Sequence, residues 1–255
     1  MLEPAERTAT VQHAFERGAQ AGTFLHNLLE WVARAGFSSV LERPGMLRDV
    51  IARRCRLRNL AHWIDPLQAW LTALLETPFE MPEASPLCLS ALGDYQTEME
   101  FWFSASRVDA EALDRIVCRY VLPGEPRPAL LPRRIHGMFK GFIDLTFQHE
   151  GRYYVADYKS NALGPDDTAY SPTAIVQAML ANRYDMQAAL YLFALHRLLR
   201  VRIPDYDYSR DVGGACYLFL RGLAAPGQGL HVERPDVAMM DELDALFMAS
   251  EGAYV

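Results

Sequence analysis

The sequence is poor in cysteine and places no two of its cysteines close together. The four cysteines, Cys55, Cys88, Cys118 and Cys216, are scattered over 255 residues. A small secreted fold held by disulfides needs cysteines at short, regular spacings, and so does an iron–sulfur cluster. We therefore expect neither disulfides nor an iron–sulfur cluster.

Long apolar runs are also missing. The longest, at residues 189–199, is interrupted by His196 and is shorter than the ~20 residues that a helix needs to cross a bilayer. The first twenty residues carry charges where a secretory leader has an apolar stretch. These absences predict a cytoplasmic protein that does not associate with membranes.

Two further absences concern nucleotides and positive charge. There is no G-x-x-x-x-G-K-[ST] motif, so we expect no ATP-driven motor in this chain. Basic residues are outnumbered, with 25 Lys and Arg against 32 Asp and Glu and a net charge of −7. An acidic body binds nucleic acid only where basic residues are gathered locally.

Local gathering of that kind occurs in two segments. Residues 133–159 hold five Lys and Arg against three acids, and residues 183–202 hold four Arg against Asp185. The acidity is concentrated elsewhere, most clearly near the C-terminal end. A basic path for DNA is compatible with this distribution, and Lys140 and Arg183 are its candidate contacts.

The most informative part of the sequence is a pair of short β-branched and aromatic runs. Residues 141–147 (GFIDLTF) and 152–158 (RYYVADY) are typical of strands. The polar segment 148–151 between them ends in glycine, which predicts a four-residue turn and a hairpin.

The predicted turn fixes the register of the hairpin. If Phe147 pairs with Arg152, Asp144 and Asp157 become diagonal neighbours about 7–8 Å apart at the backbone. Side chains alternate between the two faces of a strand, so Asp144, Asp157 and Lys159 share one face. Carboxylates that reach toward each other over this distance can share one hard cation.

These residue types suit metal-dependent hydrolysis of a phosphodiester. Mg²⁺ prefers oxygen ligands, makes a bound water more nucleophilic and neutralises charge that grows on the phosphate. A lysine two residues beyond a metal-binding aspartate can orient or deprotonate that water and stabilise the developing charge. The alternative is an amphipathic hairpin with Asp144, Asp157 and Lys159 on its solvated face.

An aspartate at the end of one strand, followed by D-x-K on the next, is the core motif of the PD-(D/E)xK nucleases. The chain further resembles the nuclease domains of RecB-type proteins over about residues 12–250, weakly at 36–94 and 104–133. The segments that carry the resemblance are RGAQAGTFLHNLLE (17–30), EMEFWF (98–103), GMFKGFIDLTFQHEGRYYVADYKSN (137–161) and the run from Tyr170 to Gly222. Motifs of this length are specific, whereas an isolated D-x-K is not.

The resemblance implies a metal site and a catalytic residue. The family's metal ligands fall on His26, Asp144, Asp157 and the main-chain carbonyl of Tyr158, and its catalytic lysine falls on Lys159. Mg²⁺ is the implied cofactor, Mn²⁺ is expected to substitute, and Ca²⁺ is expected to bind but to support cleavage poorly.

Three accessory positions are implied as well. Glu98 matches an acid that lies at the metal site or orients its water in related nucleases, and Gln187 and Tyr191 match a Q-x-x-x-Y motif. On the residues alone, Gln187 and Tyr191 lie four apart on one helix face. Two interpretations are equally compatible with this spacing. The two residues form a hydrogen-bonding pair at the edge of the core, or they contact DNA or the active-site lysine. Glu98 and Glu100 share one wet face of a strand, which explains both without a metal.

His26 has a less specific interpretation in its own context. Gly22 and Thr23 predict a helix start with Thr23 as N-cap, and an apolar stripe follows at helical spacing. His26 lies at the edge of that stripe, where a histidine is more often a hydrogen-bonding partner than a ligand. Imidazole also suits Mn²⁺ better than Mg²⁺, so only the resemblance marks His26 as a ligand.

The order of elements indicates the fold class. We predict helices at about 22–35, 48–76, 109–120, 171–181, 184–201 and 237–248, and strands at 96–103, 134–147, 152–159 and 214–221. This pattern predicts an α/β fold with a central mixed sheet flanked by helices, which in this family is the restriction-endonuclease-like fold. We expect a single domain over 1–255, with a helical part at about 1–94 and a nuclease core at about 95–225.

The implied function is metal-dependent exo- and endonucleolytic cleavage of single- and double-stranded DNA, of the exodeoxyribonuclease V type. The context is a RecBCD-type helicase–nuclease in double-strand-break repair and degradation of foreign DNA. The implied partners are the RecC and RecD subunits, the helicase part of RecB, and RecA. Two alternatives stay open. They are a stand-alone PD-(D/E)xK nuclease and an inactive nuclease fold that serves as a scaffold, against which the intact Asp144, Asp157 and Lys159 argue.

Overall fold

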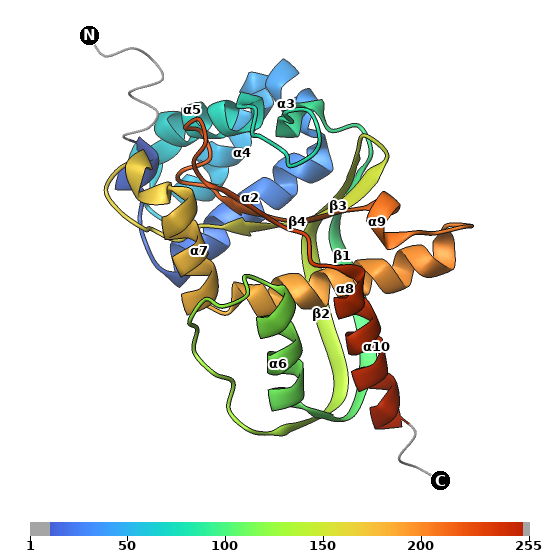
Figure 1. Cartoon of the computed structure of the whole chain (residues 1–255). Helices are drawn as coiled ribbons and strands as arrows, with labels where there is room; N and C mark the ends of the chain where they lie inside the picture. The colour runs from blue at the N-terminus through green and yellow to red at the C-terminus, as the bar shows by residue number, and fades with distance from the viewer. Residues whose placement is uncertain (1–10, 252–255) are drawn as a thin grey trace. The chain divides into compact units, whose positions relative to one another are not determined.

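The computed structural model describes residues 11–251, which form helices around a five-stranded sheet. In sheet order the strands are β1 (Tyr95–Asp109), β2 (Arg134–His149), β3 (Arg152–Lys159), β4 (Val212–Phe219) and β5 (Leu230–Glu233) (Figure 1). The helices are α2 (Ala19–Ala35), α3 (Phe37–Glu42), α4 (Pro44–Arg56), α5 (Ile64–Glu76), α6 (Ala110–Tyr120), α7 (Pro172–Ala181), α8 (Tyr184–Arg202), α9 (Tyr208–Asp211) and α10 (Val237–Glu251). None of the described helices is both long enough and apolar enough to cross a membrane.

The sheet is mixed, which confirms the predicted fold class. β2 and β3 pair antiparallel. β3 and β4 run parallel, because Gly213 lies against the Tyr154 ring near their first residues, and the Leu220 N–H donates to the Lys159 carbonyl at their far ends. Helices α7 and α8 connect these two strands, as parallel neighbours require.

The register of the β2–β3 hairpin differs from the prediction. His149, not Phe147, pairs with Arg152, and the turn consists of Glu150 and Gly151 alone. Both turn residues have positive φ, +48° and +81°, the geometry of tight hairpin turns that match the strand twist. The predicted register was therefore wrong by two residues. Because two residues is the period of side-chain alternation, the set of side chains that share a face is unchanged.

The described residues gather into two compact units, each built from separate stretches of chain. The first unit holds residues 11–97, 158–175 and 217–231, and the second holds 98–157, 176–216 and 232–251. Strand β3 crosses from the second unit to the first between Asp157 and Tyr158. A single domain over 1–255 stays a prediction, and its first ten and last four residues lie outside the described range.

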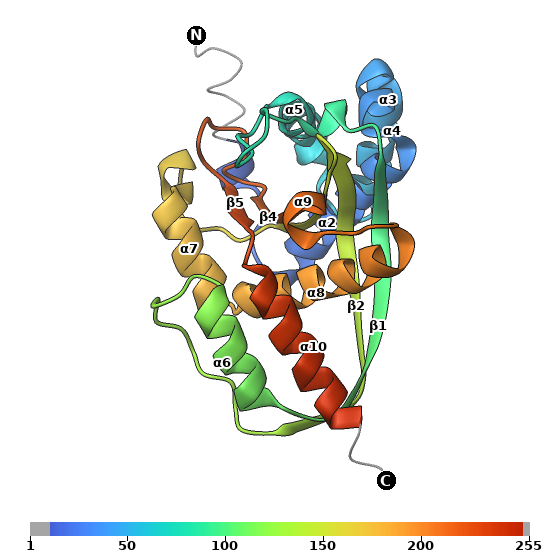
Figure 2. The ribbon, with the colours of Figure 1, turned by 45° about the vertical axis from the view of Figure 1, so that its right-hand side comes forward.

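In the first unit, α2, α3, α4 and α5 pack against one another (Figure 2). Their apolar faces form its core, and Leu28, Ile51 and Leu67 are each fully buried. The predicted start of the first long helix was wrong. α2 begins at Ala19, and the Thr23 hydroxyl donates back to the Ala19 carbonyl at 3.0 Å instead of capping a helix start.

In the second unit, α6, α8 and α10 contact one another, and α6 and α10 lie side by side in both views (Figures 1 and 2). Phe103, Phe139, Phe193 and Phe247 join β1 and β2 to α8 and α10, with ring centroids 5.0–5.7 Å apart. β1 continues to Asp109, six residues beyond its predicted end. The extension has few β-branched or aromatic side chains, so its strand conformation follows from packing and not from propensity.

Candidate functional site

Three acidic residues from neighbouring strands gather in the second unit, and we call them the acid cluster (Glu98, Asp144 and Asp157). Asp144 of β2 and Asp157 of β3 are 8% and 5% exposed. The paired part of the hairpin ends at Leu145 and Ala156, the residues next to these two aspartates. Glu98 of β1 is half-buried, and one of its carboxylate oxygens lies within 4.8 Å of a carboxylate oxygen of Asp144.

Glu98 reaches Asp144 because the backbone of β1 is irregular at that residue. Its φ is +50°, in the left-handed region that non-glycine residues seldom adopt. The sulfur of the next residue, Met99, lies 3.7 Å from the hydroxyl of Thr146, which shares the face of Asp144. Regular alternation would send Glu98 to the opposite face. An irregular residue in a strand re-aims its side chain, as β-bulges do next to active sites.

Helix α8 presents two neutral groups to the acid cluster. Gln187 Nε2 donates to Asp157 Oδ1 at 2.9 Å and to the Tyr191 hydroxyl at 2.7 Å. Tyr191 in turn donates to the Phe142 carbonyl at 2.8 Å. Burial raises the pKa of Tyr191, and the charges of Asp157 and Asp144 raise it further, so the phenol keeps its proton as a donor. The Q-x-x-x-Y pair therefore holds both an aspartate and the strand that carries the other one.

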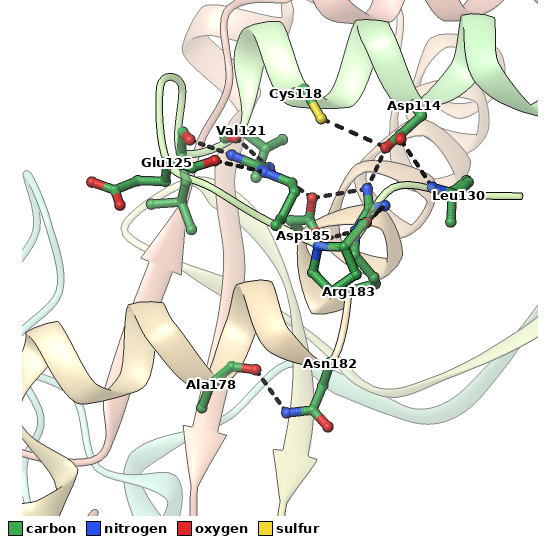
Figure 3. A network of polar contacts seen from close by, with 12 residues as sticks. Asp114, Cys118, Val121, Glu125, Leu130, Ala178, Asn182, Arg183 and Asp185 are labelled. Atoms are coloured by element: carbon green, nitrogen blue, oxygen red, sulfur yellow. Dashed lines mark hydrogen bonds and ion pairs between the residues drawn. The ribbon is translucent and has the colours of Figure 1, made fainter.

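The start of α8 is anchored by four charged residues, which we call the arginine–aspartate network (Asp114, Arg127, Arg183 and Asp185). Arg127 Nη1 lies 2.7 Å from Asp185 Oδ2, and Arg183 bridges Asp185 Oδ1 at 3.1 Å and Asp114 Oδ1 at 2.5 Å. The Asp185 side chain is fully buried. Figure 3 shows Asp185 and Arg183 together beside α6, the helix that carries Asp114.

The network also fastens the proline-rich loop 123–132 to α8. Arg127 donates to the carbonyls of Val121 and Leu122, and Arg183 donates to the Pro128 carbonyl at 2.7 Å. Asp185 comes two residues before Gln187 in α8. The network thus fixes the helix turn from which Gln187 projects toward the acid cluster.

Asp114 shows the electrostatic effect of the network. Burial alone would raise the pKa of Asp114. The hydrogen bonds from Arg183 and from the Leu130 N–H outweigh that effect and hold the pKa below its ordinary value. Sequence patterns could not find this network, because two of its three ion pairs join residues 58 and 69 positions apart.

The two predicted DNA contacts lie in different settings. The Arg183 side chain is only 13% exposed and its guanidinium is engaged in the network, which disfavours a contact between Arg183 and DNA. Lys140 is exposed on β2, ion-pairs with Glu100 at 2.6 Å and lies 4.4 Å from the centroid of the Trp102 ring. Glu98 lies near Asp144, whereas Glu100 pairs with Lys140. The sequence alone placed both glutamates on one wet face and did not predict this difference.

Tyr158 and Lys159 continue β3 into the first unit. Lys159 is 8% exposed, and its ammonium nitrogen lies 5.3 Å from the centroid of the Tyr217 ring. Asp157 and Lys159 are two residues apart in one strand and so share a face, as predicted from the D-x-K pattern.

A buried arginine holds the chain just beyond Lys159. Arg221 is 1% exposed and donates to the Ser160 carbonyl at 3.1 Å. Its other donors reach three carbonyls of the N-terminal segment (Gln12, Phe15 and Glu16). The chain is therefore held in place directly after the D-x-K residues.

Helix α2 brings His26 toward the same strand end. A side chain at Gly22 would meet the Ser160 hydroxyl at 2.8 Å, so the glycine allows the first turns of α2 to approach β3 closely. His26 follows one helical turn later on that face. It is half-buried, and its ring centroid lies 6.3 Å from that of Tyr158, at a steep angle of 74°.

Comparison with known proteins identifies the family of the chain. The chain matches the PD-(D/E)XK nuclease superfamily over residues 2–250. It is 42% identical to RecBCD enzyme subunit RecB of Escherichia coli K12 over 247 residues, which cover 94% of this chain and 20% of that protein. It is 37% identical to RecBCD enzyme subunit RecB of Haemophilus influenzae, over 91% of this chain and 18% of that protein.

The similarity is confined to a part of these relatives, since the chain spans about a fifth of their length. A shorter match of 90 residues is 43% identical to the RecB subunit of Mycobacterium tuberculosis. The superfamily match covers nearly the whole chain, and the relative that is 42% identical covers 94% of it. The chain therefore belongs to the PD-(D/E)XK nuclease superfamily.

Proposed function

We propose that the chain is the DNA-cleaving domain of a RecBCD-type helicase–nuclease and that it hydrolyses phosphodiester bonds with the help of a divalent cation. The observation that carries the proposal is the acid cluster, in which carboxylate oxygens of Glu98 and Asp144 lie within 4.8 Å of each other and Asp157 begins the D-x-K motif of the next strand. A solvated amphipathic hairpin, the alternative explanation, would expose these side chains. Asp144, Asp157 and Lys159 are all at most 8% exposed.

The residues of the site fit a hard cation. Ligand oxygens lie about 2.0–2.6 Å from Mg²⁺ or Ca²⁺, so two ligands of one ion are at most about 4–5 Å apart. The 4.8 Å limit between the Glu98 and Asp144 oxygens meets that requirement. We propose Asp144, Asp157 and the Tyr158 carbonyl as oxygen ligands and His26 as a nitrogen ligand. Glu98 joins the ligands directly or through water.

We propose Mg²⁺ as the natural ion, with Mn²⁺ as a substitute because the imidazole of His26 favours a transition metal. When bound, the cation supplies an activated water and neutralises charge on the scissile phosphate. Lys159 carries a positive charge on the face of Asp157, where it stabilises the charge that develops on the phosphate and can exchange a proton with the water. Gln187 holds one oxygen of Asp157 and so fixes the direction of the other.

The proposal is tested by degradation of single- and double-stranded oligonucleotides by the chain with and without Mg²⁺. Asp157→Ala should abolish cleavage while the far-ultraviolet circular dichroism stays that of the wild type, because a ligand is removed and the core is kept. Lys159→Gln should lower the rate by roughly 10²–10⁴-fold and leave Mg²⁺ affinity nearly unchanged. Cleavage by Asp157→Ala at the wild-type rate would refute the assignment of the site.

The RecB relatives are named as subunits of RecBCD enzymes, and we propose RecC, RecD, the helicase part of RecB and RecA as partners. The role that follows is DNA degradation during double-strand-break repair and defence against foreign DNA. Co-purification of the longer protein that carries this chain with tagged RecC and RecD tests this part. Recovery of the chain's protein alone, under conditions in which RecC and RecD recover each other, would favour a stand-alone nuclease.

A further inference from the structure

The first unit contains a basic cavity that the proposed cleavage site does not use. It measures about 290 Å³ and is lined by residues of α2 and of α4 with the turn that follows it (Asn27, Glu30, Trp31, Arg34, Arg54 and Arg58). We call it the α2–α4 cavity, and both helices are labelled in Figure 1. Three of its six lining residues are arginines.

The charge around the cavity is opposite to that of the chain as a whole. Residues 43–58 contain six arginines and one acid, Asp49, which gives a local charge of +5 in a chain of net charge −7. Of these arginines, Arg53, Arg56 and Arg58 are exposed, and Arg48 forms an exposed ion pair with Asp65 at 2.7 Å. Such local charge is what a polyanion requires of an acidic protein.

The arginines of the cavity keep donors available. Arg54 Nη1 donates to the main-chain carbonyl of Asn27 at 2.5 Å, and the Arg58 guanidinium lies 5.1 Å from the centroid of the Phe24 ring. Within the described part of the chain, neither arginine forms an ion pair with a carboxylate. Each guanidinium has five N–H donors, so most remain able to bind an anion.

The acid in the cavity does not neutralise this charge. Glu30 ion-pairs with Arg34 at 2.6 Å, one helical turn along α2. Burial lowers the pKa of Arg54, the charge of Glu30 raises it, and the neighbouring Arg53 and Arg58 lower it again. The pKa of Arg54 is therefore lowered mainly because the guanidinium is partly buried, and the nearby arginines add to that effect.

The cavity is next to a proposed metal ligand on the same helix. Asn27 directly follows His26, and Glu30 lies four residues beyond His26 on the same helix face. Trp31 is half-buried at the cavity wall and offers an aromatic surface among the arginines. Arginines bind phosphate through two parallel hydrogen bonds, and aromatic side chains stack on the bases of single strands.

We propose that the α2–α4 cavity binds the phosphate backbone of single-stranded DNA, with Arg54 and Arg58 on phosphates and Trp31 against a base. This inference rests on the proposed function, because it gives that substrate a second contact beside His26. Free phosphate or a nucleotide product shares the same chemistry and is distinguished by the experiment.

The test measures binding of a fluorescein-labelled oligo(dT) in EDTA by anisotropy, at several KCl concentrations, so that cleavage plays no part. Arg54→Gln/Arg58→Gln should weaken binding and reduce the slope of log K against log [KCl] by about 1.4, or about 0.7 for each lost phosphate contact. Trp31→Leu should weaken binding by about 5- to 150-fold with little change in slope.

Arg53→Gln/Arg56→Gln is the matched control, since it removes the same charge from α4 at residues outside the cavity. The inference requires this control to keep the wild-type slope. Equal losses in both double variants, or no loss in either, would overturn it. Arg54→Lys/Arg58→Lys keeps the charge and should bind more weakly than the wild type with nearly the same slope, because the bidentate geometry is lost.

Two further comparisons distinguish a site for DNA from a site for free anions, and this inference from the proposed function. If inorganic phosphate or dTMP protects the wild type but not Arg54→Gln/Arg58→Gln from heat, while both proteins bind oligo(dT) equally, the cavity is a site for free anions and the DNA assignment is overturned. The binding assay also stands apart from the proposed function. Cavity-dependent binding without Mg²⁺-dependent cleavage would refute the nuclease proposal alone, and cleavage with unaltered binding in the cavity variants would refute this inference alone.

Discussion

Buried and half-buried aspartates occur in two contrasting settings in the second unit. In the arginine–aspartate network, Asp114 and Asp185 lie against two arginines at 2.5–3.1 Å. In the acid cluster, Asp144 lies within 4.8 Å of another carboxylate, and Asp157 accepts from the neutral amide of Gln187. The same residue type therefore serves two purposes at similar burial.

The difference indicates that the arginine–aspartate network stabilises the unit, whereas the acid cluster is arranged to bind a cation. A buried acid beside an arginine is compensated, and removing one partner strands the other charge. Two acids side by side repel each other, and the repulsion falls when one is protonated or a cation binds. Disrupting the network should therefore lower the free energy of unfolding strongly, and a metal ion should not change that effect. Removing a charge from the acid cluster should not destabilise the metal-free fold, but it should abolish stabilisation by a metal ion.

The largest expected effect follows from breaking the network. Asp185→Ala should lower the free energy of unfolding by about 3–5 kcal/mol, because Arg127 loses its partner and Arg183 loses one of two. Urea denaturation of wild type and variant measures the change. A loss below about 1 kcal/mol, the ordinary value of an exposed pair, would remove the contrast between the two settings.

A smaller effect of opposite sign is expected in the acid cluster. Asp144→Asn should raise the free energy of unfolding in EDTA by about 0.5–2 kcal/mol, the usual gain when strain at a functional site is relieved. Mg²⁺ should raise the melting temperature of the wild type and leave that of the variant nearly constant. Glu100→Gln, in an exposed ion pair nearby, serves as the control for loss of an acidic charge. Equal Mg²⁺ stabilisation of wild type and Asp144→Asn would contradict the prediction.

The network should also confer a dependence of stability on acid pH. The pKa of Asp114 is held below its ordinary value, so its charged form is favoured in the folded state. Its stabilising effect is complete above that value and is lost as the pH falls through the lower, folded-state pKa. Asp114→Asn should therefore be less stable than the wild type at neutral pH, and the difference should shrink in acid. Melting curves from neutral pH down to the acid limit of folding test this. A gap that is constant with pH would show that the Asp114 charge is not involved.

The smallest effect is expected at the surface. Arg119 and Glu242 form an ion pair between α6 and α10 at 2.6 Å, with side chains 60% and 35% exposed. Glu242→Gln should change the free energy of unfolding by about 0–1 kcal/mol, and less at high salt, because solvent screens the charges. A change as large as that expected for Asp185→Ala would mean that burial does not determine how much each ion pair contributes to the free energy of unfolding.

The motifs of the site were accessible from the sequence because they are local. The pair of strands around the turn, the Asp144 position and the D-x-K lysine depend on alternation over a few residues. Even the wrong hairpin register preserved the shared face, since the error was two residues. The unexpected detail was the tight Glu150–Gly151 turn, in which a non-glycine residue adopts positive φ.

Other features of the site depend on residues far apart in the chain. Glu98 reaches Asp144 through a local backbone conformation that ordinary alternation does not include. Gln187 reaches Asp157 across 30 positions, after the network has set the start of α8. The length of β1 and the start of α2 were also misjudged, because packing outweighed the propensities of single residues.

The sequence by itself determined the fold class, the two aspartates and the lysine of the candidate site, because each is written in short-range periodicity and motif spacing. The tertiary structure decided how Glu98 is aimed, which acids are paired with Arg127 and Arg183, and where the α4 arginines and Trp31 form a cavity. The physical reason is that charge compensation and burial depend on distances between side chains. Those distances are fixed only when segments separated by tens of residues pack together.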